Sequence, residues 1–382
     1  MLTNADMAEL IDLRRELHRF PEVSGEEAET AARVTAALKA TRPDQVITHL
    51  GGHGVAAVWN GAAAGETVLF RCELDALPIE ELGRPDYRST IPGRGHMCGH
   101  DGHMTILMAL ARLISRNRPA TGRVILLFQP AEEDGSGAAA VLRDPRYSQI
   151  KPDWAFALHN MPGQKLCHAT LRAGTMMCAS QGMLVRFTGK TSHASMPETG
   201  TSPVNAICRL IPRLLALGPG GPLTADFRMV TITHVKIGEP AFGISPGDAE
   251  LWVKLRTRED LPMAAMRAEA EAITRDEAAK DGLTVVFETH DDFSATVNDA
   301  QAIERLTQAL DALQIAHDDQ NLPLRGSEDF GRFGDENTKM AMMFLGSGEE
   351  HPQLHNPDYD FPDSLIAPGA RLFQRVMTDI LG

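Results

Sequence analysis

One short stretch of the sequence gathers the side chains that bind transition metals. Residues 95–103 read GHMCGHDGH and hold one thiol, three imidazoles and one carboxylate. Gly99 separates Cys98 from His100 and gives the backbone the freedom to turn both donors toward one ion. Thiolate and imidazole are zinc ligands. A polar loop with incidental histidines is the less favoured alternative, because three of the chain's 14 histidines fall within these nine residues.

An acidic pair follows a buried strand that the apolar pattern predicts over 123–129. Glu132 and Glu133 come shortly after this strand, and ligands of α/β proteins bind beyond the carboxyl ends of strands. Neighbouring side chains point in different directions, so one carboxylate could bind a metal while the other acts as general base on a metal-bound water. Alone, the pair is better explained as a solvated helix start, where acidic groups stabilise the helix dipole.

Two later histidines complete a candidate ligand set. His159 directly follows a strand predicted over 154–158, and His355 lies in a loop near the C-terminus. Each alone is a weak signal, because a single histidine at a strand end is commonly a hydrogen-bonded core residue. Together with the two stretches above, they supply thiolate, imidazole and carboxylate groups near strand ends or in loops. This donor set suits Zn²⁺, or else Mn²⁺, Co²⁺ or Ni²⁺.

Three further polar residues are candidates for supporting roles. Asp75 follows a strand predicted over 67–72 and could accept an imidazole N–H, although a turn aspartate is an equal alternative. Asp101, inside the first stretch, is a candidate for contacts around the ligands or the substrate. His193 lies in the segment GKTSHASMP, and by itself it is best interpreted as a surface-loop histidine.

The elements that must position these residues alternate between helices and strands. A helix predicted from Asn4 ends before Pro21, and Ser24 and Glu27 predict a capping box for a second helix that ends near Leu38. Strands and helices then interleave, which predicts an α/β layer domain with a mostly parallel sheet. The expected strands include 54–59 and 67–72, interpreted as neighbours, followed by 123–129, 154–158 and 340–344.

A different order of elements interrupts this pattern between residues 182 and 293. The expected order is β-α-β-β-α-β, which is typical of a ferredoxin-like unit. We therefore expect a catalytic domain in two parts, 1–181 and 294–382, with an inserted α+β domain over 182–293. The expected elements of the insert are strands 183–187, 230–237, 249–257 and 283–288 and helices 203–217 and 261–280.

Composition and charge exclude several classes of protein. The chain has 382 residues and a formal net charge of −14, and it lacks the basic face that a nucleic-acid partner requires. No apolar run approaches the ~20 residues that span a bilayer. The five cysteines are odd in number and widely spread, so a disulfide framework is not expected. With no apolar signal region at the N-terminus, the sequence favours a reducing cytoplasm.

The chain also resembles a known family along its whole length. It is similar to the amidohydrolase subfamily of the aminoacylase/carboxypeptidase metallopeptidases (peptidase family M-twenty, subfamily D). That subfamily includes hippurate hydrolases, N-acetyl-diaminopimelate deacetylases and plant auxin-amino-acid hydrolases. The motifs that carry the resemblance are RRELHRFPEVSGEE, ELDALPIEE, GHMCGHDGHMT, FQPAEEDGSGA, ALHNMPG, GKTSHASMP, GSEDFG and LHNPDYDF.

The resemblance implies a role for each candidate. A site of two divalent metal ions would be held by Cys98, His100, Glu133, His159 and His355, with the thiolate bridging. Glu132 would be the general base. His193 would polarise the scissile carbonyl, serving the active site of a partner subunit, which implies a homodimer formed through an inserted lid domain. The fold implied is a zinc-peptidase-like catalytic domain.

The implied activity is hydrolysis of N-acyl amino acids or similar small amides. A metallo-dipeptidase or carboxypeptidase remains the nearest alternative, because the same centre would serve a peptide bond. A metal-binding protein without turnover is a second alternative, although it would not need Glu132 beside a ligand.

Two residues depart from the family pattern. Glu73 stands where the family usually has a shorter aspartate, and Gly243 stands where an asparagine usually helps to hold the substrate. Arg256 resembles a basic position of the insert that pairs with a substrate carboxylate, with a structural salt bridge as an equal alternative.

Overall fold

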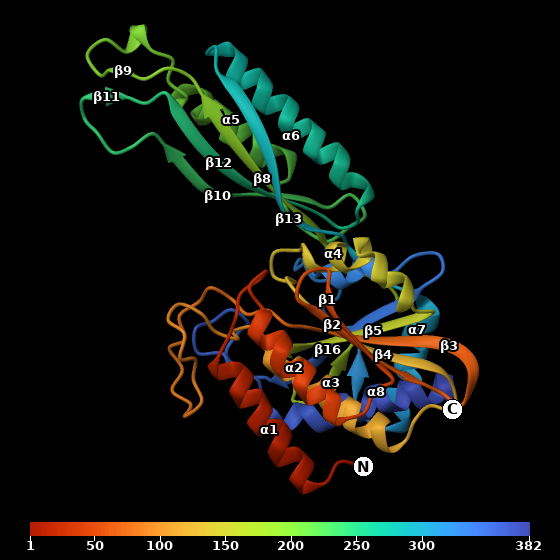
Figure 1. The fold of residues 1–382 in the computed structure, drawn as a ribbon. Helices are drawn as coiled ribbons and strands as arrows, with labels where there is room; N and C mark the ends of the chain where they lie inside the picture. Colours follow the sequence, from red (N-terminus) through yellow and green to blue (C-terminus); the bar gives the residue numbers. More distant parts are fainter. The chain divides into compact units, whose positions relative to one another are not determined.

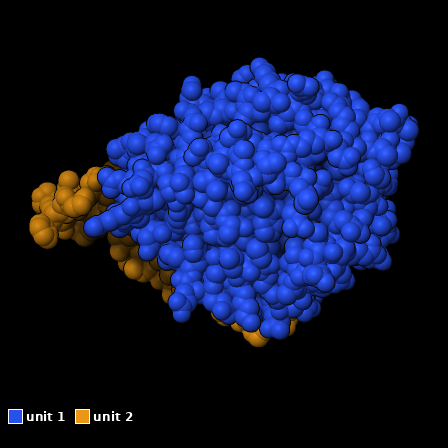
Figure 2. Space-filling view, turned by 90° about the horizontal axis from the view of Figure 1, so that it is seen from below, with its two compact units in different colours: residues 1–176, 296–322, 328–382 blue, residues 177–295, 323–327 orange.

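The computed structural model describes residues 1–382, and its contacts divide the chain into two compact units. Unit 1 comprises Met1–Met176, Thr296–Leu322 and Glu328–Gly382, and unit 2 comprises Met177–Ala295 and Pro323–Ser327. Figure 2 colours the two units separately. None of the helices combines the length and the apolar character that a membrane span requires.

Unit 1 is built on one mixed sheet of eight strands in the order β1-β2-β4-β3-β5-β16-β6-β15. The four central strands β4, β3, β5 and β16 run parallel to one another. This mixed α/β architecture with a mostly parallel core confirms the predicted fold class. The strands are β1 (Gln45–Leu50), β2 (Gly54–Asn60), β3 (Ala63–Glu73), β4 (Thr121–Gln129), β5 (Trp154–Pro162), β6 (Ala169–Thr170), β15 (His317–Asp318) and β16 (Lys339–Gly348).

The five long helices of unit 1 cover one face of this sheet, and a short helix lies on its other side (Figure 1). Alternate strand residues such as Phe70, Leu126 and Phe156 share one apolar cluster with the five long helices of unit 1. These helices are α1 (Asn4–Arg19), α2 (Ala28–Ala40), α3 (His100–Arg116), α7 (Ala300–Ala312) and α8 (Ile366–Leu381). Shorter segments complete the unit: α4 (Gly137–Arg143), η1 (Pro145–Gln149), β7 (Gly174–Met177), β14 (Thr296–Asn298), η3 (Asp329–Phe333) and η4 (Asp363–Leu365).

The parallel core fixes where chemistry can occur. Because β3, β4, β5 and β16 run in the same direction, their carboxyl ends meet at one edge of the sheet. The residues that leave this edge are those after Glu73, after Gln129, around His159 and after Gly348. Four of the polar segments identified in the sequence therefore lie at this edge of the sheet.

Two local predictions are wrong. Strands β2 and β3 are not neighbours, because β4 lies between them, antiparallel to β2 and parallel to β3. Ser24 does not cap α2, which begins at Ala28 without any side-chain cap from its N-cap residue Glu27. The first amides of α2 are instead satisfied by Glu22, which accepts from Glu29 N–H at 3.3 Å and from Thr30 N–H at 2.6 Å.

Unit 2 has the order of elements that the sequence predicts. Its four-stranded antiparallel sheet runs β10-β12-β8-β13, and two helices pack against it. When β8, β10, β12 and β13 are numbered 1 to 4 in chain order, their order across the sheet, counted from β13, is 4-1-3-2. This is the ferredoxin-like arrangement. The elements are β8 (Ala179–Thr188), β9 (Ser192–His193), η2 (Pro197–Thr199), α5 (Val204–Leu217), β10 (Arg228–Ile237), β11 (Ile244–Ser245), β12 (Asp248–Thr257), α6 (Leu261–Lys280) and β13 (Thr284–Phe293).

Candidate metal centre

A left-handed glycine turns the chain sharply between Cys98 and His100. Gly99 has φ +86° and precedes the first residue of α3. A Cβ atom at Gly99 would also lie 2.0 Å from the side-chain oxygen of Asn160, so only glycine fits there. The Asn160 amide in turn donates to the main-chain oxygen of Cys98 at 3.1 Å. The thiol and the imidazole are thus held against the end of β5.

The imidazole of His100 presents a lone pair to its surroundings. Its Nδ1–H donates to the main-chain oxygen of Asp75 at 2.8 Å, so Nε2 is the nitrogen that is unprotonated whenever the ring is neutral, as a metal ligand must be. Nε2 is buried without a hydrogen-bond partner, and so is Oε1 of Glu133. These two atoms lie 3.9 Å apart. An unpartnered nitrogen facing an unpartnered carboxylate oxygen is an arrangement that a cation between them would satisfy.

His159 is oriented in the same way. Its Nδ1–H donates to the main-chain oxygen of Asn160 at 2.7 Å, and its Nε2 lies 3.3 Å from the sulfur of Cys98. His355 reaches the site from the loop after β16, where its own N–H donates to the main-chain oxygen of Met97 at 2.8 Å. Its Nε2 lies 3.7 Å from Oε2 of Glu133.

The five predicted ligands form two donor groups that share one residue. Cys98, His100 and His159 make one group, and Cys98, Glu133 and His355 make the other. Within each group the ligand atoms lie within 4.8 Å of one another. Glu132 joins His100 and Glu133 in a third group. The structure therefore brings together all six residues that the sequence selected for the metals and the base.

The acidic groups of the site are buried, and their ionised forms would be stabilised by a cation. Burial raises the pKa of the Cys98 thiol well above its ordinary value, and the carboxylates of Glu133 and Glu132 add to this. Burial likewise raises the pKa of Glu132, with the charges of Glu328 and Glu133 next in effect. Burial raises the pKa of Glu133 to about 7, although His100 opposes the shift. Divalent cations would stabilise these groups in their charged forms, so the donor set fits metal ions.

A second polar layer lies behind the ligands, and sequence reasoning missed most of it. His103 contacts Glu73 through Nδ1 at 2.7 Å and Asn160 through Nε2 at 3.0 Å. Its ring lies 4.7 Å from that of His159. The longer Glu73 side chain, noted as a departure from the family, thus takes part in orienting this layer. The histidine-rich stretch itself was the signal for His103.

A buried arginine joins this layer to a distant acidic motif. Arg71 is fully buried, pairs with Glu73, and contacts Glu328 at 2.9 Å and Asp329 at 2.7 Å. Glu328 and Asp329 also form a buried acidic group with Glu132. The only sequence signal for this contact was the motif GSEDFG. No local pattern reveals that its acidic residues contact Arg71 of β3.

The two supporting aspartates have different surroundings, and only Asp75 meets one of the proposed ligands. Asp75 meets His100 mainly through its main-chain oxygen, while its carboxylate Oδ1 lies 3.7 Å from Nδ1. Asp101 contacts Arg14 at 3.0 Å and Nδ1 of His18 at 2.8 Å. It belongs to none of the donor groups. Its side chain anchors α1 to the start of α3.

The remaining candidates lie in unit 2. The ring of His193 is exposed, and its Nδ1 accepts from the Ser195 N–H at 3.2 Å and lies 2.7 Å from the Ser195 hydroxyl oxygen. Because a backbone N–H can only donate, the proton of the neutral ring is on Nε2. Gly243 accepts from the N–H of Ala194 at 3.0 Å, with open space where a Cβ would lie.

Arg256 of unit 2 has local partners. Its guanidinium donates to the main-chain oxygen of Arg325 and to the hydroxyl of Ser327, both at 2.8 Å. These contacts attach β12 to the segment 323–327 of the same unit.

This fold and this donor set define a metallopeptidase-type hydrolase. The family model described as Peptidase family M20/M25/M40 matches residues 69–379, and the chain belongs to that family. It is a hydrolase of amide bonds, as the names of its relatives indicate.

Three known proteins illustrate the likeness. The chain is 28% identical to a hippurate hydrolase of Campylobacter jejuni, over 95% of this chain and 94% of that protein. It is 29% identical to an N-acetyl-L-cysteine deacetylase of Bacillus subtilis, over 94% and 85%. The structure of a dinuclear metal-binding peptidase of Bacillus subtilis aligns with a TM-score of 0.81 at 23% identity, covering 100% of this chain and 99% of that one.

Proposed function

We propose that this chain hydrolyses N-acyl amino acids or similar small amides at a site of two divalent metal ions. The observation that carries the proposal is the sharing of Cys98 between two donor groups. A thiolate that belongs to both donor groups would be available as a ligand to both ions. The proposed ligands are Cys98, His100, Glu133, His159 and His355. The donor types favour Zn²⁺ or Mn²⁺, with Co²⁺ or Ni²⁺ as further candidates.

Different residues of the chain would transfer the proton and stabilise the negative charge that develops during the reaction. When bound, the two cations would lower the pKa of a water molecule and attract the carbonyl oxygen of the amide. Glu132 is buried beside two of the proposed ligands, which supports the proposal that its carboxylate takes a proton from the attacking water. The same carboxyl group would then give the proton to the nitrogen of the leaving amine.

His193 is proposed to stabilise the negative charge that develops on the carbonyl oxygen. The Ser195 contacts leave its Nε2–H free to donate, which is the form that an oxyanion requires. We propose that residues 182–293 act as a lid and dimerisation domain, and that His193 serves the active site of the partner subunit. We further propose Asp75 and Asp101 as supports of the ligand loops and Arg256 as a contact of the substrate carboxylate.

The proposed substrates follow from the relatives and the proposed compartment from the cysteines. The two curated relatives are named for hippurate and for N-acetyl-L-cysteine, and both names describe an acylated amino acid. All five cysteines are free, which supports a cytoplasmic location.

A substrate panel tests the proposal. Purified protein loaded separately with Zn²⁺, Mn²⁺, Co²⁺ or Ni²⁺ would be assayed on N-acetyl, N-benzoyl and longer N-acyl amino acids, with dipeptides of the same residues in parallel. We expect metal-dependent release of the free amino acid from at least one N-acyl series, at a higher kcat/KM than from the matched dipeptides. Faster hydrolysis of the dipeptides would favour a peptidase, and metal binding without any hydrolysis would contradict enzymatic function.

A further inference from the structure

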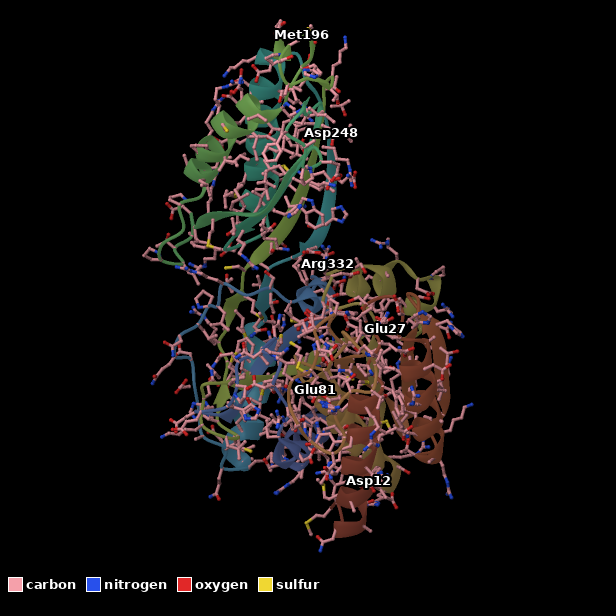
Figure 3. All side chains as sticks on the ribbon, turned by 90° about the vertical axis from the view of Figure 1, so that its left-hand side faces the viewer. Asp12, Glu27, Glu81, Met196, Asp248 and Arg332 are labelled. Carbon is pink, nitrogen blue, oxygen red and sulfur yellow. The ribbon has the colours of Figure 1, made fainter.

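The segment between α1 and α2 lies against the turn that carries the proposed base. Glu27 is fully buried at the N-terminal end of α2, in unit 1 (Figure 3). Its Oε1 accepts from the N–H of Ala131 at 2.8 Å and from the N–H of Gly25 at 2.9 Å. Ala131 is the residue directly before Glu132. A carboxylate more than 100 positions away in sequence thus holds the start of the catalytic turn.

This turn needs an external partner. Ala131 has φ +50°, in the left-handed region that residues with a Cβ rarely adopt. Its main-chain oxygen is already engaged by the N–H of Gly137 at 2.9 Å, and its own N–H is buried, where an unpaired donor is costly. Glu27 supplies the acceptor and so favours the strained conformation over a relaxed one.

A second tether holds the other side of the base. Asp75 accepts from the N–H of Glu133 at 2.9 Å, and the same carboxylate oxygen accepts from the hydroxyl of Ser24 at 2.7 Å. The amides on both sides of Glu132 are therefore bound by carboxylates that the Ser24–Glu27 segment supplies or orients.

Glu27 is not needed as a cap of its own helix. The first free amides of α2 are taken by Glu22, which leaves the Glu27 side chain to the catalytic turn. We propose that Glu27, assisted by Ser24, is a positioning residue that fixes the backbone around Glu132 for proton transfer. This inference rests on the proposed function.

Two variants of Glu27 distinguish the effect of its hydrogen bond to the Ala131 N–H from the effect of a side chain that only fills the same space. Glu27→Met removes the acceptor at similar length, whereas Glu27→Gln keeps one acceptor oxygen. With metal-loaded protein, we expect Glu27→Met to lower kcat by about 10²-fold with KM nearly unchanged, because a small displacement of a catalytic group has an effect of that size. Glu27→Gln should stay close to the wild-type kcat. Both should keep the wild-type metal content.

Amide hydrogen exchange at Ala131 reports the tether without any assay of activity. Ala131 should be protected in the wild type and in Glu27→Gln, and should exchange faster in Glu27→Met. Glu22→Met is the matched control, because it removes a carboxylate from the same helix start without touching the catalytic turn. It should lower the melting temperature but not kcat.

A further variant keeps the test decisive if Glu27→Met does not fold. Ser24→Ala removes one hydroxyl from a half-buried position and should lower kcat while leaving KM nearly unchanged. Equal kcat in the wild type, Glu27→Met and Ser24→Ala would overturn the positioning role, as would equal losses in Glu27→Met and Glu22→Met. A wild type that cleaves no N-acyl amino acid would instead overturn the proposed function, and Ala131 exchange would still show whether the tether exists.

Discussion

The sulfur of Cys98 lies 3.3 Å from Nε2 of His159, whose Nδ1–H is fixed by the main-chain oxygen of Asn160. The same sulfur belongs to the donor group that contains Glu133 and His355. Removing this thiol therefore affects both groups. We predict that Cys98→Ala lowers the metal content by about half or more, because thiolate is a principal ligand in such sites.

Elemental analysis of the purified variant measures this directly. Cys208→Ala is the matched control, because Cys208 is free, exposed and located on α5 of unit 2. Its metal content should equal that of the wild type. An unchanged metal-to-protein ratio in Cys98→Ala would remove this thiol from the ligand set.

His18 predicts a pH dependence of stability through its contact with Asp101. Burial alone would lower the pKa of His18, but Asp101 outweighs this and raises it to about 9 from an ordinary value of 6.5. The stabilisation is therefore fully present below pH 6.5 and is lost as the pH rises through 9. A shift of this size corresponds to about 3 kcal/mol.

Urea unfolding of the wild type and His18→Gln at pH 6 and pH 10 tests this prediction. The wild type should have the higher free energy of unfolding at pH 6, and the difference between the two proteins should shrink by pH 10. A difference that is the same at both pH values would show that the Asp101 contact is not an ion pair.

Ser195 is predicted to control the tautomer of His193. Its N–H and hydroxyl both contact Nδ1, so the neutral ring should carry its proton on Nε2. Ser195→Ala should lower the population of this tautomer and reduce kcat about 3- to 10-fold, the value of one hydrogen bond.

The ¹⁵N chemical shifts of the His193 ring distinguish the two tautomers. Ser192→Ala is the control. Ser192 lies beside His193 in the same strand, and its hydroxyl has no hydrogen-bond partner. A His193 spectrum that is identical in the wild type and Ser195→Ala would refute the role of the hydroxyl.

The sequence predicted the site better than its supports, for a physical reason. Cys98, Glu133, His159 and His355 each follow an apolar run or lie in a loop, and the parallel direction of the strands is enough to place strand ends at one edge. Whether these residues bind metal stays a prediction. The direction of the strands accounts for the positions of Glu133 and His159, whereas Cys98 and His355 lie in loops whose paths no strand direction fixes.

The supports depend on contacts between distant segments, which local patterns do not contain. Ser24 and Glu27 match a capping box, yet their side chains contact Asp75 and Ala131 instead. Arg71 meets Asp329 across 258 positions of sequence. The insertion of β4 between β2 and β3 is of the same kind, since pairing order is decided by packing rather than by propensity.

Mixing inactive variants tests the proposed dimer. Glu132→Gln and His193→Ala should each be inactive alone. Refolded together, they should recover about a quarter of wild-type activity, because half of the random dimers are mixed and each mixed dimer has one intact site. Mixtures as inactive as the separate variants would place His193 in the active site of its own chain.

The most direct test of the account is the activity of Glu132→Gln. The amide keeps the shape of the carboxylate but cannot take a proton, so kcat should fall by about 10³-fold or more. Metal content and melting temperature should stay at wild-type values, which circular dichroism and elemental analysis measure on the same sample. Near wild-type hydrolysis by this variant would contradict the assignment of Glu132 as the general base.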